Sequence, residues 1–187
     1  MLIGYRTVNE EEAFTTNLDN KPFSVRWTED EDPNVFQLGY GYYLTNKPGS
    51  WPGRPGREKW VCVIEANLEL MKAVRKIWVP EYWTEEVSYA TYEEKVLWNT
   101  PEKDILNYIH AELPDVDATK VLRFSYISRF GSNLQMVIPI DVVDGDTLDF
   151  YATCYETEEE LASYVNQEVP WGRWRDIAGH PGMPTYQ

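Results

Sequence analysis

The alternation of hydrophobic and polar positions predicts strands in the first and last thirds of the chain. Apolar runs typical of strands cover residues 2–7, 38–45 and 60–66. After residue 120 the same character returns, in residues 121–127, 134–140 and 147–155. The dipeptide Asp144-Gly145 is typical of a tight turn, so we expect it to join the last two of these strands.

Helix signals lie between and around these runs. They cover a segment after residue 7 and residues 68–75, 100–112 and 157–165. Thr7 or Asn9 is the expected N-cap of the first helix, whose first turn is acidic. Thr100 and Thr157 are the expected caps of the last two, with Pro101 at a first helical position.

Two further segments are less regular. Residues 78–98 are rich in aromatic side chains, and we expect them to be partly helical; the tail from residue 170 holds glycine, proline and tryptophan and is expected to be irregular. No internal repeat or linker divides residues 1–187. The chain is therefore predicted to be one α+β domain, with mixed or antiparallel sheets and helices packed between and around them.

Composition and charge narrow the possible partners. The 187 residues are 43% hydrophobic and 14% aromatic, enough for a folded core, and the formal net charge is −14. Repulsion at this charge opposes unassisted binding to nucleic acid or to an anionic membrane. One stretch is locally basic, and it could hold a small anion or balance nearby carboxylates: Lys47, Arg54, Arg57 and Lys59 against Glu58.

The cysteine pattern bears on redox state and location. Cys62 and Cys154 each lie within an apolar run, so we expect them to be small buried hydrophobes rather than a disulfide pair. No spacing typical of metal ligands occurs, and no metal is expected. The first residues lack the apolar segment of a signal peptide, and no apolar run is long enough to span a membrane, so a cytoplasmic location is expected.

Several catalytic classes are excluded by their missing residues. Only His110 and His180 are present, so a multi-histidine zinc site cannot form. We expect His110 to lie at the surface or at a core edge, and His180 belongs to the irregular tail. Glycine-rich phosphate loops and the Gly-x-Ser-x-Gly motif of hydrolases are absent. The chemistry that remains available comes from arginine, tyrosine and glutamate side chains.

The order of the N-terminal motifs resembles a known fold. A strand ends in Tyr5-Arg6, a helix contains Glu12-Ala13, and a strand of the Gly-x-Gly-x-Tyr-Leu-Thr type begins at Gly39. An apolar strand that ends near Glu65 follows. This order, which covers about a third of the chain, resembles the N-terminal half of the ADP-ribosyltransferase fold.

The resemblance implies roles for individual residues. Arg6 would contact the ribose and phosphate of NAD, and Tyr43 would pack on nicotinamide, with Tyr42 as the alternative because strand residues alternate in face. Thr45 would be the short hydroxyl residue that follows. Glu168 would hold a ribose hydroxyl and stabilise the cationic sugar carbon while nicotinamide leaves, because a fixed carboxylate offsets developing positive charge.

The resemblance also implies what the protein acts on. NAD would be a substrate cleaved at the nicotinamide–ribose bond, in a transferase or glycohydrolase reaction that needs no metal. Arg54 would lie near the NAD or target entrance, and the acceptor is expected to be a protein. Asn166 stands where arginine-modifying members have Gln or Glu, and Asp149 and Glu156 remain alternatives to the late glutamate.

A second hypothesis is an interaction module without catalysis. An acidic, aromatic-rich protein would favour a basic partner, or would mimic nucleic acid. Exposed Tyr and Trp side chains would dock that partner, and Trp171 and Trp174 either anchor it or cover a core edge. Loss of association with added salt is expected under this hypothesis.

Overall fold

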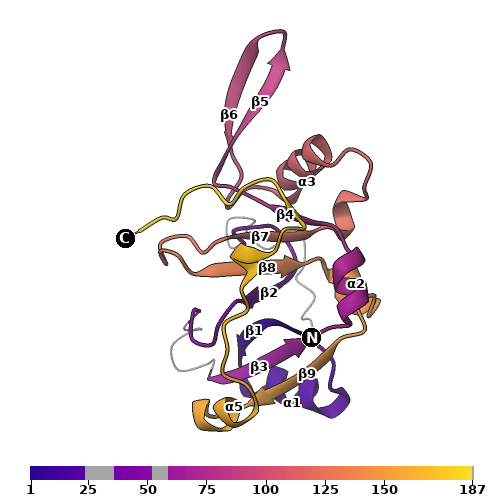
Figure 1. Cartoon of the computed structure of the whole chain (residues 1–187), viewed down its shortest axis with the longest axis vertical. Helices are drawn as coiled ribbons and strands as arrows, with labels where there is room; N and C mark the ends of the chain where they lie inside the picture. The colour runs from indigo at the N-terminus through magenta and orange to yellow at the C-terminus, as the bar shows by residue number, and fades with distance from the viewer. Residues whose placement is uncertain (24–35, 52–58, 187) are drawn as a thin grey trace.

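The computed structural model describes residues 1–23, 36–51 and 59–186, and these form a mixed sheet of eight strands (Figure 1). The strands are β1 (Leu2–Val8), β2 (Tyr42–Thr45), β3 (Trp60–Glu65), β4 (Lys76–Trp78), β7 (Leu122–Tyr126), β8 (Leu134–Ile138), β9 (Tyr151–Tyr155) and β10 (Ile177–Ala178). Their order across the sheet is β10-β4-β7-β8-β2-β1-β3-β9. The pairs β10–β4 and β4–β7 are parallel, and the other neighbours are antiparallel. The predicted α+β class is confirmed.

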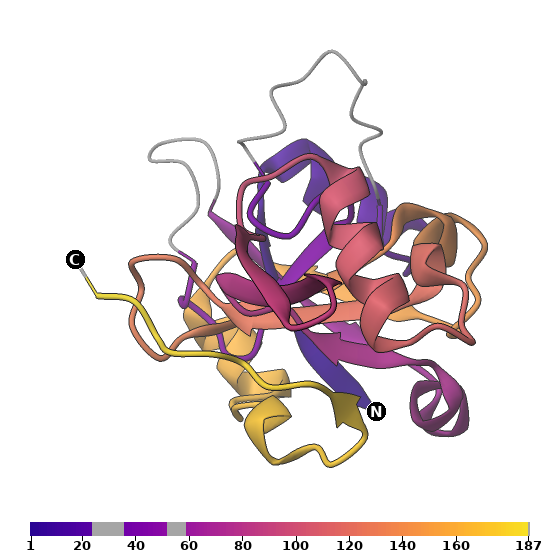
Figure 2. The ribbon, with the colours of Figure 1, turned by 90° about the horizontal axis from the view of Figure 1, so that it is seen from above.

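Helices lie on both sides of this sheet, as the view from above shows (Figure 2). They are α1 (Glu10–Asp19), α2 (Leu68–Ala73), α3 (Glu102–Glu112), α4 (Ile140–Asp144) and α5 (Glu158–Tyr164). The Asn9 side chain accepts a hydrogen bond from the Glu12 amide, and Thr157 forms a capping box with Glu160. The predicted N-caps of the first and last helices are therefore confirmed, with Asn9 rather than Thr7 capping α1.

Buried side chains form a core on each face of the sheet. Met136 and Ile138 of β8 belong to the larger cluster, which also holds Phe124 and Trp171. Val137, between them on the same strand, belongs to the cluster that α3 covers. Because neighbouring strand residues point to opposite faces, β8 contributes to both cores.

The segment after α5 returns along the sheet and is pinned to it at its far end. Trp171 is fully buried, its indole Nε1 donates to the Ile3 carbonyl at 3.0 Å, and its ring packs edge-on against Phe124. The buried Lys76 ammonium donates to Asp176 at 2.6 Å beside β10. These contacts fix the path of residues 165–178, and Trp171 covers the core rather than anchoring a partner.

The prediction of partial helix in residues 78–98 is wrong, because most of this segment is a hairpin. Strands β5 (Tyr82–Ser88) and β6 (Thr91–Val96) pair with each other through a two-residue turn at Tyr89-Ala90. The segment is rich in Tyr, Trp, Thr and Val, which fit a pleated surface better than a helix. It extends away from the sheet at the top of Figure 1.

Two local predictions need correction at proline residues. Asp144-Gly145 does not join two paired strands: Pro139 begins α4, Gly145 ends it, and the following strand β9 pairs with β3. Thr100 does not cap α3, because its hydroxyl donates to the Leu97 carbonyl and Pro101 occupies the cap position.

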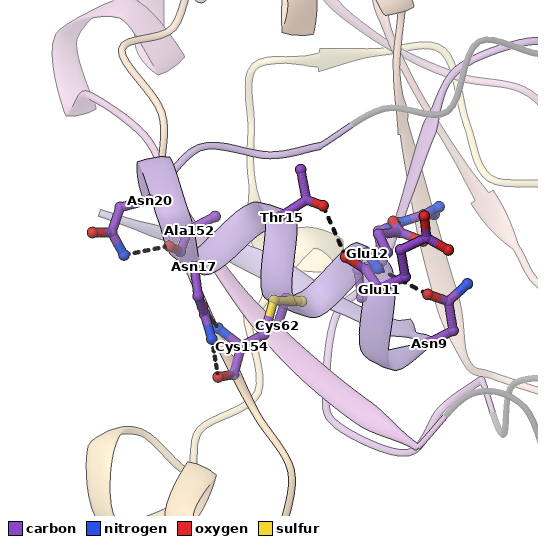
Figure 3. Close-up of a disulfide and its surroundings, with 10 residues drawn as sticks. Asn9, Glu11, Glu12, Thr15, Asn17, Asn20, Cys62, Ala152 and Cys154 are labelled. Atoms are coloured by element: carbon purple, nitrogen blue, oxygen red, sulfur yellow. Dashed lines mark hydrogen bonds and ion pairs between the residues drawn. A yellow bond between two sulfur atoms is a disulfide. The ribbon is translucent and has the colours of Figure 1, made fainter.

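The expectation of unpaired cysteines is also wrong, since Cys62 and Cys154 form a disulfide (Figure 3). The residues lie directly opposite each other on the antiparallel pair β3–β9, although 92 positions separate them in sequence. Both are buried, as predicted, and α1 lies over them, with Asn17 bonded to the backbone of Cys154. Among the helices of the described residues, none has the length and apolar character needed to cross a bilayer.

Candidate functional site

The candidate site is built around β2, where three of the predicted residues lie in one short strand. Tyr42, Tyr43 and Thr45 alternate in burial along it. Its neighbours are β8 on one side and, through the Tyr5–Thr45 pair, β1 on the other. Because successive side chains of β2 point to opposite faces of the sheet, Tyr42 and Tyr43 contact different parts of the protein.

Glu168 is held at the end of this strand by Asn46. The Asn46 amide Nδ2 donates to Glu168 Oε1 at 2.7 Å, and Asn46 itself is only 2% exposed. The backbone amide of Val169 donates to the Asn46 carbonyl at 2.8 Å, and the Tyr5 hydroxyl donates to the Gln167 carbonyl at 2.7 Å. The Asn46 amide thus holds the carboxylate, and the backbone on either side of Glu168 is bonded to Tyr5 of β1 and to Asn46.

A glycine in β1 makes room for the segment that carries Glu168. A Cβ atom on Gly4 would lie 3.0 Å from both the Leu44 Cβ and the Trp171 ring. Any larger residue at position 4 would displace one of these buried groups, and the segment at 165–171 would move with Trp171. Gly4 therefore acts on the site indirectly, through packing.

A cavity of about 490 Å³ opens beside Glu168. It lies between the turn after β2, on one side, and α5 with the segment that follows it, on the other. Its lining residues are Lys47, Pro48, Glu159, Leu161, Ala162, Val165, Asn166, Gln167 and Glu168. This volume is within the range of about 300–1,000 Å³ that small-molecule sites occupy. Its wall combines an apolar helix face with one cation, Lys47, and two carboxylates.

Two buried polar atoms near the turn after β2 have no hydrogen-bond partner in the part of the chain that the structure describes. They are Asn46 Oδ1 and Ser50 Oγ. Buried polar atoms without a partner are uncommon and cost stability. The Asn46 side-chain amide therefore donates to Glu168, while its carbonyl oxygen accepts no hydrogen bond from the described residues.

Arg6 faces α1 and is not among the residues that line the cavity. Its Nε donates to Glu12 Oε1 at 2.8 Å, its Nη1 donates to the Tyr43 carbonyl at 3.2 Å, and its guanidinium lies 4.5 Å from the centre of the Tyr42 ring. Burial raises the pKa of the Tyr42 hydroxyl, and the Arg6 charge opposes that shift. Arg6 and Tyr42 are thus brought together, but neither lines the cavity beside Glu168.

Tyr43 points into the core that α3 covers. Its hydroxyl accepts from the Leu38 amide at 2.9 Å and donates to the Gly39 carbonyl at 2.7 Å. Burial raises the pKa of this hydroxyl, so it stays protonated at neutral pH. The hydroxyl closes the loop that leads into β2, and its contacts are internal to that loop.

A buried ion pair that the sequence did not reveal supports the same loop. Arg123, 1% exposed in its side chain, donates to Glu102 at 2.5 and 3.0 Å and to the Leu38 carbonyl at 2.9 Å. Glu102 also accepts from the Tyr40 amide, and a Cβ on Gly39 would lie 1.9 Å from Glu102 Oε2. Gly39, with φ of +77°, is therefore required both by its backbone conformation and by this close approach.

The remaining predicted residues are placed as follows. Thr45 is half-buried, and its hydroxyl donates to the Lys47 carbonyl at 3.0 Å, within the turn that borders the cavity. Asp149 is 69% exposed in a turn beside Lys21, and Glu156 is exposed at the start of α5; neither lines the cavity. Arg54 lies outside the described residues.

The parts of the chain that the structure describes contain no set of metal ligands. No group of three or more His, Cys, Asp or Glu side chains there is arranged to hold an ion. His110 and His180 are both exposed.

Comparison with known proteins gives a family match. A profile described as "Family of unknown function (DUF5910)" matches residues 36–180, which include β2, the cavity and Glu168 but not Arg6. No curated protein and no solved structure matches the chain.

Proposed function

The chain belongs to the DUF5910 family, whose function is unknown, and we propose that it is an NAD-dependent ADP-ribosyltransferase or NAD glycohydrolase. The observation that carries the proposal is the Glu168 carboxylate, fixed by Asn46 at the edge of a cavity of about 490 Å³.

The proposed reaction breaks the bond between nicotinamide and ribose. The bonding electron pair leaves with nicotinamide, which becomes neutral, and the sugar carbon becomes cationic. A nucleophile from water or a protein side chain then bonds to that carbon and loses a proton to solvent. Glu168 would stabilise the cationic carbon, because a carboxylate that is already positioned reorganises little as the charge develops.

The charged side chains around the cavity would bind different parts of NAD. Lys47 on the cavity wall would pair with a phosphate, whereas Glu168 would face the sugar. Arg6, the phosphate ligand that the resemblance implies, would first have to exchange its ion pair with Glu12 for the substrate. We therefore assign the first phosphate contact to Lys47 and keep Arg6, Tyr42, Tyr43, Thr45 and Arg54 as predictions from the resemblance.

The compartment in which the protein works also remains a prediction. The sequence favours the cytoplasm, but the Cys62–Cys154 disulfide favours an oxidising compartment, because thiols are kept reduced in the cytosol. Mass spectrometry of freshly extracted protein, alkylated before and after reduction, separates these locations. Alkylation before reduction is expected in the cytoplasm, and alkylation only after reduction is expected elsewhere.

The function is tested by following nicotinamide release from NAD, with and without a mixture of acceptor proteins. We expect release by the wild type and a loss of about 100-fold or more in Glu168→Gln, which keeps the size of the side chain but removes its charge. Glu156→Gln is the matched control, because it removes one negative charge from an exposed position outside the cavity. Release by Glu168→Gln at the wild-type rate, or no release by the wild type in either condition, would contradict the proposal.

A further inference from the structure

The β5–β6 hairpin is a separate feature that the proposed reaction does not use. Its base is fixed to the rest of the protein: the Leu97 amide donates to the Glu81 carbonyl, and the Trp83 ring packs edge-on against Tyr108 at 5.4 Å. Beyond that base every residue of β6 is exposed. Figure 1 places the hairpin at the opposite end of the molecule from α5, which lines the cavity.

The strand register sorts the hairpin side chains onto two faces. Trp83, Glu85, Glu93 and Lys95 share the face that contacts α3 through Trp83. The other face, called here the tyrosine–glutamate face, consists of Tyr82, Thr84, Glu86, Tyr92, Glu94 and Val96. On that face Tyr82 is 50% and Tyr92 is 61% exposed.

Folding alone does not account for this face. A two-stranded hairpin is at best marginally stable, and its exposed aromatic rings gain little by remaining in water. On this face Glu86 and Glu94 are diagonal neighbours, and their like charges repel each other. Residues 81–96 hold five glutamates and one lysine, so the hairpin carries an excess of negative charge that its own residues do not neutralise.

We propose that the tyrosine–glutamate face is a docking surface for an arginine- or lysine-rich segment of another protein. Glu86 lies opposite Tyr92 and diagonal to Glu94, so a cation between these carboxylates would also lie near an aromatic ring. Arginine gains from both groups at once, through charge-assisted hydrogen bonds to carboxylate and through stacking on the tyrosine ring. Binding would also reduce the repulsion between Glu86 and Glu94.

The charge of the chain argues against a second copy of itself as the partner. The net charge is −14, and two hairpins that approached face to face would bring together glutamates from both copies. A basic segment instead gains long-range attraction before contact. The proposal does not depend on the NAD reaction, because the hairpin lies apart from the cavity.

The experiment measures binding without NAD. A fluorescein-labelled peptide of alternating arginine and glycine is titrated with the full chain at physiological ionic strength and followed by fluorescence anisotropy. We expect two hairpin variants, Glu86→Gln with Glu94→Gln and Tyr82→Ser with Tyr92→Ser, to weaken binding by about 10-fold or more. The matched control is Glu11→Gln with Asp19→Asn, which removes two exposed charges from α1 and is expected to change binding less than about 2-fold.

Each other outcome would overturn the proposal. Equal weakening in the α1 control would mean that net charge alone attracts the peptide, and full binding by the hairpin variants would place the peptide elsewhere. Light scattering that shows a dimer dependent on Tyr82 and Tyr92 would assign the face to a second copy. Circular dichroism confirms folding of each variant, and unchanged peptide binding by Glu168→Gln separates this result from the test of the NAD reaction.

Discussion

The central sheet and the β5–β6 hairpin place strands of similar length in opposite environments. All five residues of β8 are buried, whereas all six residues of β6 are exposed. In β8 the two faces serve two cores, so packing restricts each side chain. The exposed side chains of β6 are not restricted by a core. The tyrosine and glutamate residues there therefore contact solvent or a partner.

This contrast also shows which contacts fix the position of a functional side chain. Glu168 lies on a segment without regular secondary structure, yet buried neighbours fix it from both sides: Asn46 holds its carboxylate and Trp171 anchors the chain three residues later. The hairpin is held only at its base, by Trp83 and by the backbone bond from Leu97 to Glu81, among the contacts of the described residues. We therefore expect mutations around the sheet to affect stability and activity, and mutations on the hairpin to affect binding with little cost to the fold.

The largest expected effect comes from removing the disulfide. The Cys62→Ala, Cys154→Ala double variant loses the link between strands that are 92 residues apart, and we expect the free energy of unfolding to fall by about 4 kcal/mol. Urea denaturation of oxidised wild type, reduced wild type and the double variant measures this loss. A difference below about 1 kcal/mol would mean that β3 and β9 hold their pairing without the bond.

Asn46→Ala is expected to have the next largest effect on stability. It removes the hydrogen bond to Glu168 from a site that is 2% exposed, and we expect a loss of about 1–3 kcal/mol. Nicotinamide release should fall by about 100-fold, because a freed carboxylate no longer stays beside the reacting carbon.

Asn46→Asp gives a sharper comparison at the same position. It keeps the shape of the side chain but sets a second carboxylate against Glu168, so we expect stability at neutral pH below that of Asn46→Ala. Denaturation and nicotinamide assays run side by side test both variants. Wild-type release by Asn46→Ala would mean that Glu168 does not need this support.

The hairpin supplies the contrasting case. Tyr92→Ala truncates a side chain that is 61% exposed, and we expect the free energy of unfolding to change by less than about 0.5 kcal/mol. Thermal and urea denaturation measure the change. A loss as large as that of a core substitution would show that the hairpin packs against the rest of the protein more closely than its exposure indicates.

The smallest effect is expected at alkaline pH, where α5 meets β3. The Tyr164 hydroxyl donates to Glu65 at 2.9 Å, and this hydrogen bond, with partial burial, raises the pKa of Tyr164 to about 12. Since the folded protein holds the proton more tightly than the unfolded chain, the bond stabilises the fold below pH 10 and is lost as the pH rises toward 12.

The difference in free energy of unfolding between the wild type and Tyr164→Phe should therefore become smaller as the pH rises from 10 to 12. Urea denaturation at a series of pH values measures the difference, which solvent exposure of Tyr164 keeps small. A difference that stays constant from pH 9 to 12 would contradict this assignment.

Local signals in the sequence predicted local structure well. Asn9 and Thr157 marked two helix starts, because capping uses side chains within one turn of the helix. The capping signal failed at Thr100, whose hydroxyl donates to the Leu97 carbonyl. The prediction of partial helix failed for residues 78–98, whose aromatic side chains lie mostly on an exposed hairpin.

Long-range pairing was the part that the sequence could not supply. Cys62 and Cys154 meet because β9 pairs with β3, and Asn46 meets Glu168 because residues 165–169 return to the end of β2. Glu168 itself was predicted from its place in a resemblance. The Asn46 amide that binds Glu168 could not be predicted, because no local pattern around residue 46 indicates a contact with residue 168.

The most direct test of the proposed NAD site is thermal unfolding with and without NAD, using a variant that fills the cavity. Ala162→Trp places an indole on the cavity wall, and Ser163→Trp is its control on the exposed surface of the same helix. At an NAD concentration about 100 times its dissociation constant, we expect stabilisation by about 2.7 kcal/mol in the wild type and in Ser163→Trp, and none in Ala162→Trp. An equal shift in all three proteins, or a wild type that NAD does not stabilise, would contradict the assignment of this cavity to NAD.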